Sequence, residues 1–263
     1  MAFELRLYDP RINRWLTTDP EGQYHSPYMA MGNNPVSRVD PDGGEDNPVY
    51  GANGEGFLGT TESGLQGEAI IMDAANFTQG MSDSQAMSVG TMYSALTGLA
   101  QWNFMKSGNR THWKTLNQRP DWDGIVTINE GVSWALAHPN SNGNPSDALY
   151  LDASKLDFGS LGTSYFSFEG EVKSTNLLYK INPINNAQRR TAYALGNTRI
   201  QLVSKDARTI RVLNDAYDWD YHNGSSATSR IRDGLIWGER QRTGLNDTHG
   251  VPIRTFGLGV LKF

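Results

Sequence analysis

The densest group of reactive side chains in this sequence lies in the string NDAYDWDYH, which contains Asp215, Tyr217, Asp218, Asp220 and His222. On a strand, alternation places Asp215 and Tyr217 on one face and the later three residues on the other. Carboxylates beside an imidazole can bind a hard cation such as Mg²⁺ or position a water molecule for attack. The string therefore predicts a hydrolytic site with Asp218 and Asp220 as metal ligands. A solvated strand end without chemistry is the alternative.

The general base of such a site has two candidates. His222 ends the string itself, whereas His249 lies in the Gly-flanked loop GLNDTHGVP. Asp247 is placed to orient the ring of His249, as carboxylates do for catalytic imidazoles, and a plain turn is the alternative role for this loop. The phosphate oxygens of a substrate need cations nearby, and the candidates are Arg230, Arg232 and Arg254.

The charge of the chain is unevenly distributed along its length. The whole chain has a net charge of -5, yet residues 186–263 hold twelve Lys and Arg against seven Asp and Glu. A basic C-terminal third is where an anionic substrate such as a phosphate, a pyrophosphate or a nucleic acid would bind. The alternative is that Arg189, Arg190, Arg208 and Arg211 dock onto the acidic middle of the chain.

The composition excludes several classes of protein. The chain has no Cys, which rules out disulfides, thiol nucleophiles and thiolate metal sites. No apolar run approaches the roughly 18 residues that a membrane span needs, and no signal peptide pattern opens the sequence. A hydrophobic content of 38% together with 28 Gly is typical of a polar, turn-rich globular protein. We therefore expect a folded domain without a stable membrane span.

Apolar spacing and turn residues outline the elements. Helical spacing predicts two or three helices over residues 68–105, and a capping box at Thr127 and Glu130 predicts another helix. Alternating residues on either side of 204–207 predict a hairpin, followed by a helix at 230–242 and a closing strand in GVPIRTFGLGVLKF. The expected fold class is α+β, with a helical N-terminal half followed by a β-rich C-terminal half that forms an antiparallel sheet or half-barrel.

The start of the chain carries an ordered series of turn motifs. It runs through YDPR, RWL, the DPEG that begins at Asp19, GNNP, and the DPDG that begins at Asp40. This order resembles the C-terminal end of the Rhs (YD-repeat) core over about the first 44 residues. The resemblance implies a β shell that encloses a variable C-terminal toxin, and a self-cleavage site at Asp19 and Asp40 that releases it. Two Asp-capped turns without chemistry are the alternative, and Gly44 stands where that family usually has Leu.

The resemblance also implies a division of the chain and a set of partners. Residues 1–44 would be the end of the Rhs core and 45–67 a linker rich in Gly, Asn and acidic residues. Residues 68–263 would be the toxin domain, mainly helical over 68–140 and β-rich, with the catalytic part, over 141–263. The expected partners are the Rhs shell, a secretion or contractile injection apparatus, and a cognate immunity protein.

A second resemblance concerns residues 192–263. The segment YALGN, a hairpin, the string NDAYDWDYH and a closing GVPIRTFG follow one another in an order similar to the catalytic domain of the colicin M family. Members of that family hydrolyse lipid II, the peptidoglycan precursor, between its lipid and its pyrophosphate. The family's Asp-x-Tyr-Asp motif matches Asp215, Tyr217 and Asp218. Its His-Arg pair fits less well, because His222 comes earlier than expected and Asn223 follows it.

Together these patterns predict an antibacterial effector that is delivered into target cells and acts in their periplasm. Its expected reaction is the hydrolysis of the phosphoester or pyrophosphate linkage of a lipid-linked anionic substrate, with Mg²⁺ as cofactor. A metal-dependent nuclease toxin, active in the target cytoplasm, is one alternative. A non-enzymatic binding module and a glycan- or amide-cleaving envelope enzyme are the others.

Overall fold

The structure of the chain is a computed structural model that describes residues 8, 9, 11, 14–16, 47–141, 143–177, 180, 182, 184–217, 237, 238 and 240–262. For residues 8, 14, 15, 193 and 215–217 it describes the backbone only. The chain divides into two compact units, Met1–Asp46 and Asn47–Phe263.

The first unit contains a short hairpin. Strand β1 (Tyr8–Asp9) pairs antiparallel with β2 (Arg14–Trp15). Between them, the Asp9 carboxylate accepts hydrogen bonds from the backbone N–H of Arg11 at 3.0 Å and from its guanidinium at 2.6 Å. The hydrogen bond from the Arg11 side chain is the main reason why the pKa of Asp9 falls to about 2. The side chains of the YDPR motif therefore close their own turn.

The second unit begins with a four-stranded sheet of order β4-β3-β5-β6. Its strands are β3 (Pro48–Gly51), β4 (Phe57–Thr60), β5 (Ile70–Met72) and β6 (Gly90–Met92). β3 and β4 form an antiparallel hairpin, β5 runs parallel to β3, and β6 pairs antiparallel with β5. Helix α1 (Asp83–Val89) lies between β5 and β6 in the chain and packs Ala86 against Ile70 and Met72.

The prediction of a helical N-terminal half was wrong, because strands begin at residue 48 and helices are interspersed with them. Ile70 and Met72, expected at helical spacing, belong to β5, where Ile70 is completely buried. A short apolar run fits a buried strand as well as a helix, and β-branched Ile favours the strand. β3 and β4 also lie within residues 45–67, where the composition indicated a linker. The fold is mixed α+β, with sheets and helices alternating along the chain.

Two helices and an aromatic cluster follow this sheet. Helix α2 (Gly98–Lys106) leads into α3 (Asn109–Thr115). The cluster joins side chains from α2, β3, β4 and β7; its main members are Phe104, Tyr50, Phe57 and Tyr150. The hydroxyl of Tyr50 lies 3.0 Å from Nδ1 of His112, whose ring also packs on Phe57 at a centroid distance of 5.0 Å. This imidazole therefore has a structural role.

Two further sheets make up the rest of the unit. The first has three strands in the order β11-β12-β7, formed by Asp215–Tyr217, Val251–Phe256 and Leu149–Asp152. The second has four strands in the order β13-β10-β9-β8, formed by Gly259–Val260, Thr209–Val212, Asn197–Ser204 and Val172–Asn176. β9 and β10 form the predicted antiparallel hairpin. β12 runs parallel to β7, and Ile253 of β12 lies opposite Leu149 of β7. The two paired residues are about a hundred positions apart in the chain.

These two sheets share the same pair of chain segments. β10 continues into β11 through residues 213–214, and β12 continues into β13 through residues 257–258, so one antiparallel ribbon bends from one sheet into the other. At the bend, Oγ1 of Thr255 donates a 2.6 Å hydrogen bond to the carbonyl of Val212. Gly257 has a φ of 65°, and a Cβ there would lie 3.1 Å from a carboxylate oxygen of Asp152. The bend therefore favours glycine at this position.

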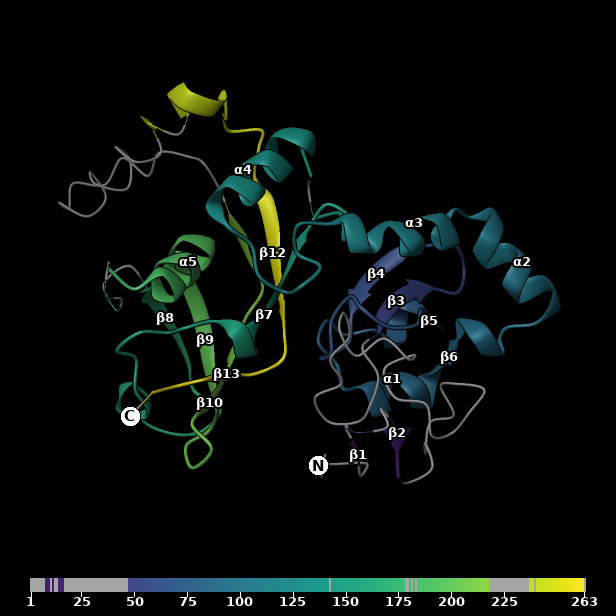
Figure 1. Cartoon of the computed structure of the whole chain (residues 1–263), viewed down its shortest axis with the longest axis horizontal. Coiled ribbons are helices and arrows are strands. Elements are labelled where there is room, and N and C mark those ends of the chain that lie inside the picture. Colours follow the sequence, from purple (N-terminus) through teal and green to yellow (C-terminus); the bar gives the residue numbers. More distant parts are fainter. Residues whose placement is uncertain are drawn as a thin grey trace. The chain divides into compact units, whose positions relative to one another are not determined.

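Two helices pack against these sheets (Figure 1). Helix α4 (Ile128–Ala137) begins at the predicted capping box, in which Thr127 and Glu130 bind each other's backbone N–H. Helix α5 (Asn186–Leu195) is capped by Asn185. Side chains of both helices join the largest apolar core, which includes Val132, Ala192, Leu195, Ile200, Leu202 and Ile253. This core fixes the position of the helices over the strands.

Among the described connections, short 3-10 helices lie at Ala74–Asn76 (η2), Tyr93–Ala95 (η3), Leu116–Gln118 (η4), Ala153–Lys155 (η5) and Thr163–Tyr165 (η6). Within the described part of the chain, no helix has the length and apolar character that crossing a membrane requires.

Candidate functional site

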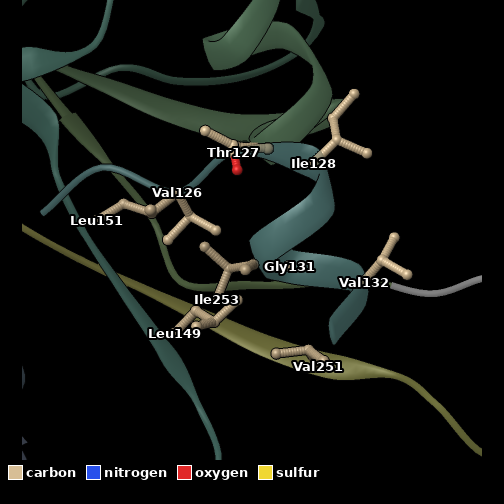
Figure 2. A pocket seen from close by; sticks show the side chains of 10 residues that line it. Val126, Thr127, Ile128, Gly131, Val132, Leu149, Leu151, Val251 and Ile253 are labelled. Carbon is tan, nitrogen blue, oxygen red and sulfur yellow. The ribbon is translucent and has the colours of Figure 1, made fainter. Parts of the chain in front are cut away.

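An apolar pocket lies on the three-stranded sheet, below the first turn of α4. Its floor is formed by Leu149 of β7 and by Val251 and Ile253 of β12, and Val126 and Ala194 add side walls. Figure 2 shows the side chains of Val126, Leu149 and Ile253 gathered beneath this helix. The volume is about 440 Å³, part of which is open to solvent. Its apolar lining can contact an apolar group of a ligand.

Local structure explains why the space remains open. The capping box sets the start of α4, since Thr127 N donates to Glu130 Oε2 at 2.8 Å and Glu130 N donates to Thr127 Oγ1 at 3.3 Å. Gly131 then faces the pocket without a side chain, and α5 contributes the small side chain of Ala194. Small residues at these two positions leave the floor uncovered.

A second hollow continues the pocket along α5. It shares Val126, Leu151 and Ala194 with the pocket, and its empty space, open solvent included, is about 290 Å³. α5 lines it with positions three, four and seven apart, which lie on one face of a helix: Ala187, Arg190, Thr191 and Ala194. We call the two hollows together the α4–α5 groove. Its second half is lined by β7 and not by β12, so it extends away from β11.

Two cationic side chains, Lys155 and Arg190, line the second half of the groove, and they differ in their partners. Lys155 forms an ion pair with Asp152 at 3.2 Å and donates to the carbonyl of Asp123 at 2.9 Å. Arg190 is exposed and forms no hydrogen bond or ion pair with the residues that the structure describes. Arg190 therefore does not dock onto an acidic partner among these residues.

Strand register brings part of the predicted reactive string to the pocket. In the β11–β12 pairing, Asp215 lies opposite Ile253 and Tyr217 lies opposite Val251. Both partners on β12 line the pocket. Positions 215 and 217 are therefore adjacent to its floor, on the side away from Arg190.

Several predicted residues lie outside the described part of the chain. They are Asp19, Asp40, Asp218, Asp220, His222, Arg230 and Arg232. The helix expected at 230–242 is described at residues 237, 238 and 240–243, which are helical. Among the described residues, no group of three or more His, Asp or Glu side chains is arranged to hold a metal ion. The Mg²⁺ site expected at Asp218 and Asp220 thus remains a prediction.

His249 lies in a tight turn just before β12. Its backbone N–H donates to the carbonyl of Asn246 at 3.0 Å, and its Nδ1 lies 3.1 Å from the backbone N of Asn246, which donates to it. The loop is anchored to the end of α4 by a 2.7 Å hydrogen bond from Asn140 N to the Thr248 carbonyl. Because Nδ1 accepts, the neutral ring carries its proton on Nε2. In this tautomer His249 is a hydrogen-bond donor toward a substrate, and its use as a base requires the turn to rearrange.

Two charged neighbours of this region have partners of their own. Asp247, considered for orienting His249, forms an ion pair with Arg240. Arg254, considered for binding phosphate, donates from Nη1 to the carbonyl of Leu58 at 2.9 Å and from Nη2 to that of Gly143 at 3.2 Å. Arg254 therefore connects β12 to β4 and to the loop before β7.

A polar cluster lies apart from the groove, at the start of α1. Ser63 Oγ donates to one carboxylate oxygen of Asp83, and Asn47 Nδ2 lies 3.5 Å from the other. Burial raises the pKa of Asp83 to about 6, and the negative charge of Glu62 adds to the shift, while the hydrogen bonds oppose it. The cluster holds the first residue of the second unit against the N-terminus of α1.

The pocket itself was not anticipated from the sequence. Its signals are weak: alternating apolar residues at 149 and 151 and again at 251 and 253, and two small residues on helices. Only the pairing of strands far apart in the chain brings them together. Arg190 was anticipated as part of the basic segment, but its place in a groove was not.

Comparisons with known proteins cover little of the chain. No family model matches it, and no solved structure matches it. A stretch of 41 residues, 16% of the chain, is 56% identical to part of Salivary gland surface protein 1 of Aedes aegypti. The matched stretch is 1% of that relative's length. This similarity does not show a family for the chain.

Proposed function

We propose that this chain is the toxin end of an Rhs-type protein and hydrolyses a phosphoester or pyrophosphate bond in an amphiphilic, lipid-linked substrate such as lipid II. The observation that carries the proposal is the register of β11 and β12, which sets positions 215 and 217 beside the apolar pocket. Positions with reactive side chains thus lie beside an apolar surface, at the β11 edge of the three-stranded sheet.

The chemistry of the pocket favours a substrate with a hydrocarbon part. Its floor and walls consist almost entirely of aliphatic side chains, which gain from contact with an apolar group at roughly 25 cal/mol per Å² removed from water. A nucleotide or a free sugar would leave this surface unused. An isoprenoid next to a phosphate fits both the pocket and the carboxylates of the string.

Roles in the reaction follow from residue type. Asp218 and Asp220 would hold Mg²⁺, and this ion would supply positive charge to the phosphate oxygens and make nearby water more acidic. Asp215 and Tyr217 position the scissile phosphate next to the pocket. His222 accepts the proton of the attacking water, because the described turn leaves His249 as a donor. His249 and the cations Arg230 and Arg232 stabilise the phosphates, while Arg254 supports the strand.

The proposed setting follows the resemblance of the first 44 residues to an Rhs core. The shell carries the toxin to a secretion or contractile injection apparatus, Asp19 and Asp40 take part in release, and an immunity protein protects the producing cell. The toxin then acts in the periplasm of the target cell, where lipid II exposes its pyrophosphate.

The test is a direct assay. The purified chain is incubated with lipid II and Mg²⁺, and release of the soluble pyrophosphoryl saccharide is measured. Asp218→Ala should be inactive, whereas Asp206→Ala, in the exposed turn between β9 and β10, should keep full activity. Cleavage of DNA or RNA without release of the saccharide would instead identify a nuclease. Killing from the cytoplasm alone would also contradict the proposal.

A further inference from the structure

Helix α2 exposes large apolar side chains on one side. Leu99 is 71% exposed, Trp102 is 49% exposed and Met105 is 37% exposed. On the other side of the helix, Phe104 is buried and packs on Tyr50 with a centroid distance of 5.2 Å. The exposed residues are therefore not part of the core, and they are close enough in helical spacing to form one surface.

The same surface carries cations. Lys106 lies one turn after Trp102, with its Nζ 4.5 Å from the centre of the indole ring. Arg110 and Lys114 follow on α3 at a spacing of four residues, which sets them on one face of that helix. Nη1 of Arg110 reaches the sulfur of Met105 at 3.3 Å. We call Leu99, Trp102, Met105, Lys106, Arg110 and Lys114 together the α2–α3 surface.

These cations have no acidic partners nearby. The sequence contains no Asp or Glu between Asp83 and Asp121. Lys106, Arg110 and Lys114 form no ion pair with a carboxylate in the described residues. By contrast, Lys155, Lys173 and Lys262 of the same unit are each paired with a carboxylate, as Lys173 is with Glu171 at 3.4 Å. The α2–α3 surface is thus positively charged as well as apolar.

Arg110 adds an independent observation. Its Nε–H is buried and has no hydrogen-bond partner among the described residues. The guanidinium carbon lies 5.7 Å from the ring centre of Tyr93, so the group is held against aromatic surface. The Nε–H is enclosed by protein and the guanidinium rests on the ring, so Arg110 is held as a fixed positive charge beside Met105, and such a charge attracts a phosphate group.

We propose that the α2–α3 surface docks the protein on an anionic phospholipid membrane. Trp102 and Leu99 would enter the boundary between head groups and acyl chains, where Trp is favoured, and the three cations would contact lipid phosphates. A nucleic acid would use the cations but would gain little from exposed Leu99 and Met105. This inference goes beyond the proposed hydrolysis and does not rest on it.

The experiment is cosedimentation of the full chain with vesicles that contain no lipid-linked saccharide. Binding to vesicles of phosphatidylcholine with phosphatidylglycerol should exceed binding to phosphatidylcholine alone, and it should weaken at high salt. The double variant L99S/W102S and the charge variant K106E/K114E should each weaken binding by about tenfold or more. The matched control Phe168→Ser replaces an apolar side chain that is 63% exposed elsewhere and should bind like the wild type.

Several outcomes would overturn the proposal. They are failure of the wild type to bind anionic vesicles, unchanged binding by both variants, and an equal loss in Phe168→Ser. Retention of DNA or RNA that is lost in K106E/K114E but kept in L99S/W102S would identify a nucleic-acid surface instead. A concentration-dependent dimer lost in L99S/W102S would identify a second copy as the occupant. Circular dichroism of each variant checks that the fold is kept. Because no turnover is measured, failure here is distinct from failure of the proposed hydrolysis.

Discussion

Asp215 of β11 is the register partner of Ile253 of β12, and Ile253 is part of the floor of the apolar pocket. This pairing places a carboxylate-bearing position next to an aliphatic surface. Asp215→Asn should therefore lower the turnover of a lipid-linked phosphate substrate by about a hundredfold or more, the usual scale for loss of a group that handles protons or orients phosphate. Asp206→Asn in an exposed turn is the control, and saccharide release is the measurement. Equal activity of the two variants would remove Asp215 from the site.

Filling the pocket should affect substrate binding more than folding. Ala194→Leu introduces a larger side chain from α5 into the space above Val251 and Ile253. We expect a raised KM for substrates with long apolar chains and a smaller effect for short-chain analogues. The exposed Ala137→Leu at the end of α4 is the matched control. Steady-state kinetics with substrates of two chain lengths provides the comparison, and identical KM values in all three proteins would show that the pocket is not used.

The turn at His249 predicts which nitrogen of the imidazole ring carries the proton. Since Nδ1 accepts a hydrogen bond from the backbone N–H of Asn246, the neutral ring should be protonated at Nε2. Nitrogen-15 NMR of the imidazole, at a pH where the ring is neutral, distinguishes the two nitrogens. A proton found on Nδ1 would mean that the turn is not formed in solution, and His249 would again be available as a base.

The buried carboxyl of Asp83 should make stability depend on pH. Burial raises its pKa in the folded protein to about 6, above the ordinary value of 3.8, so the folded state binds the proton more tightly than the unfolded state. Its stabilising contribution is complete below about pH 4 and is lost as the pH rises through 6. Relative to Asp83→Asn, the wild type should lose about 2 kcal/mol of unfolding free energy between pH 4 and pH 7. Urea unfolding at both pH values measures this, and a pH-independent difference would contradict it.

A buried ion pair should be important for folding of the second unit. Arg119 and Asp121 form two hydrogen bonds at 2.8 and 2.9 Å, and Asp121 also accepts from the backbone N–H of Tyr150 at 2.7 Å. Removing one partner leaves the other charge buried, so Asp121→Asn should cost about 3 to 5 kcal/mol. Lys262→Gln, which breaks an exposed pair with Asp157, should cost less than about 1 kcal/mol. Denaturant unfolding of the two variants tests the difference.

Local signals in the sequence predicted some of these elements well. The capping box at Thr127 and Glu130 correctly marked the start of α4, and the polar residues at 204–207 correctly marked the turn between β9 and β10. Both features are set by residues within a few positions of one another. The error at Ile70 and Met72 arose where a short apolar run fitted two structures and the neighbouring strands decided between them.

The pocket could not be predicted for a related reason. Leu149 and Ile253 become neighbours only through a parallel pairing of strands that lie far apart in the chain. Neither residue has a local pattern that specifies its partner. The reactive string NDAYDWDYH was visible from residue types alone, but the apolar surface beside positions 215 and 217 depends on register.

The shared ribbon of the two C-terminal sheets has a consequence for synthesis. A ribosome makes β7 and β8 early, but the strands that complete both sheets, β12 and β13, come from residues 251–260. Until these residues emerge, the pocket lacks Val251 and Ile253, and β10 lacks its outer partner. Such long-range pairing also folds slowly. A chain that stopped short of residue 251 would therefore lack both the floor of the pocket and the outer strand of the second sheet.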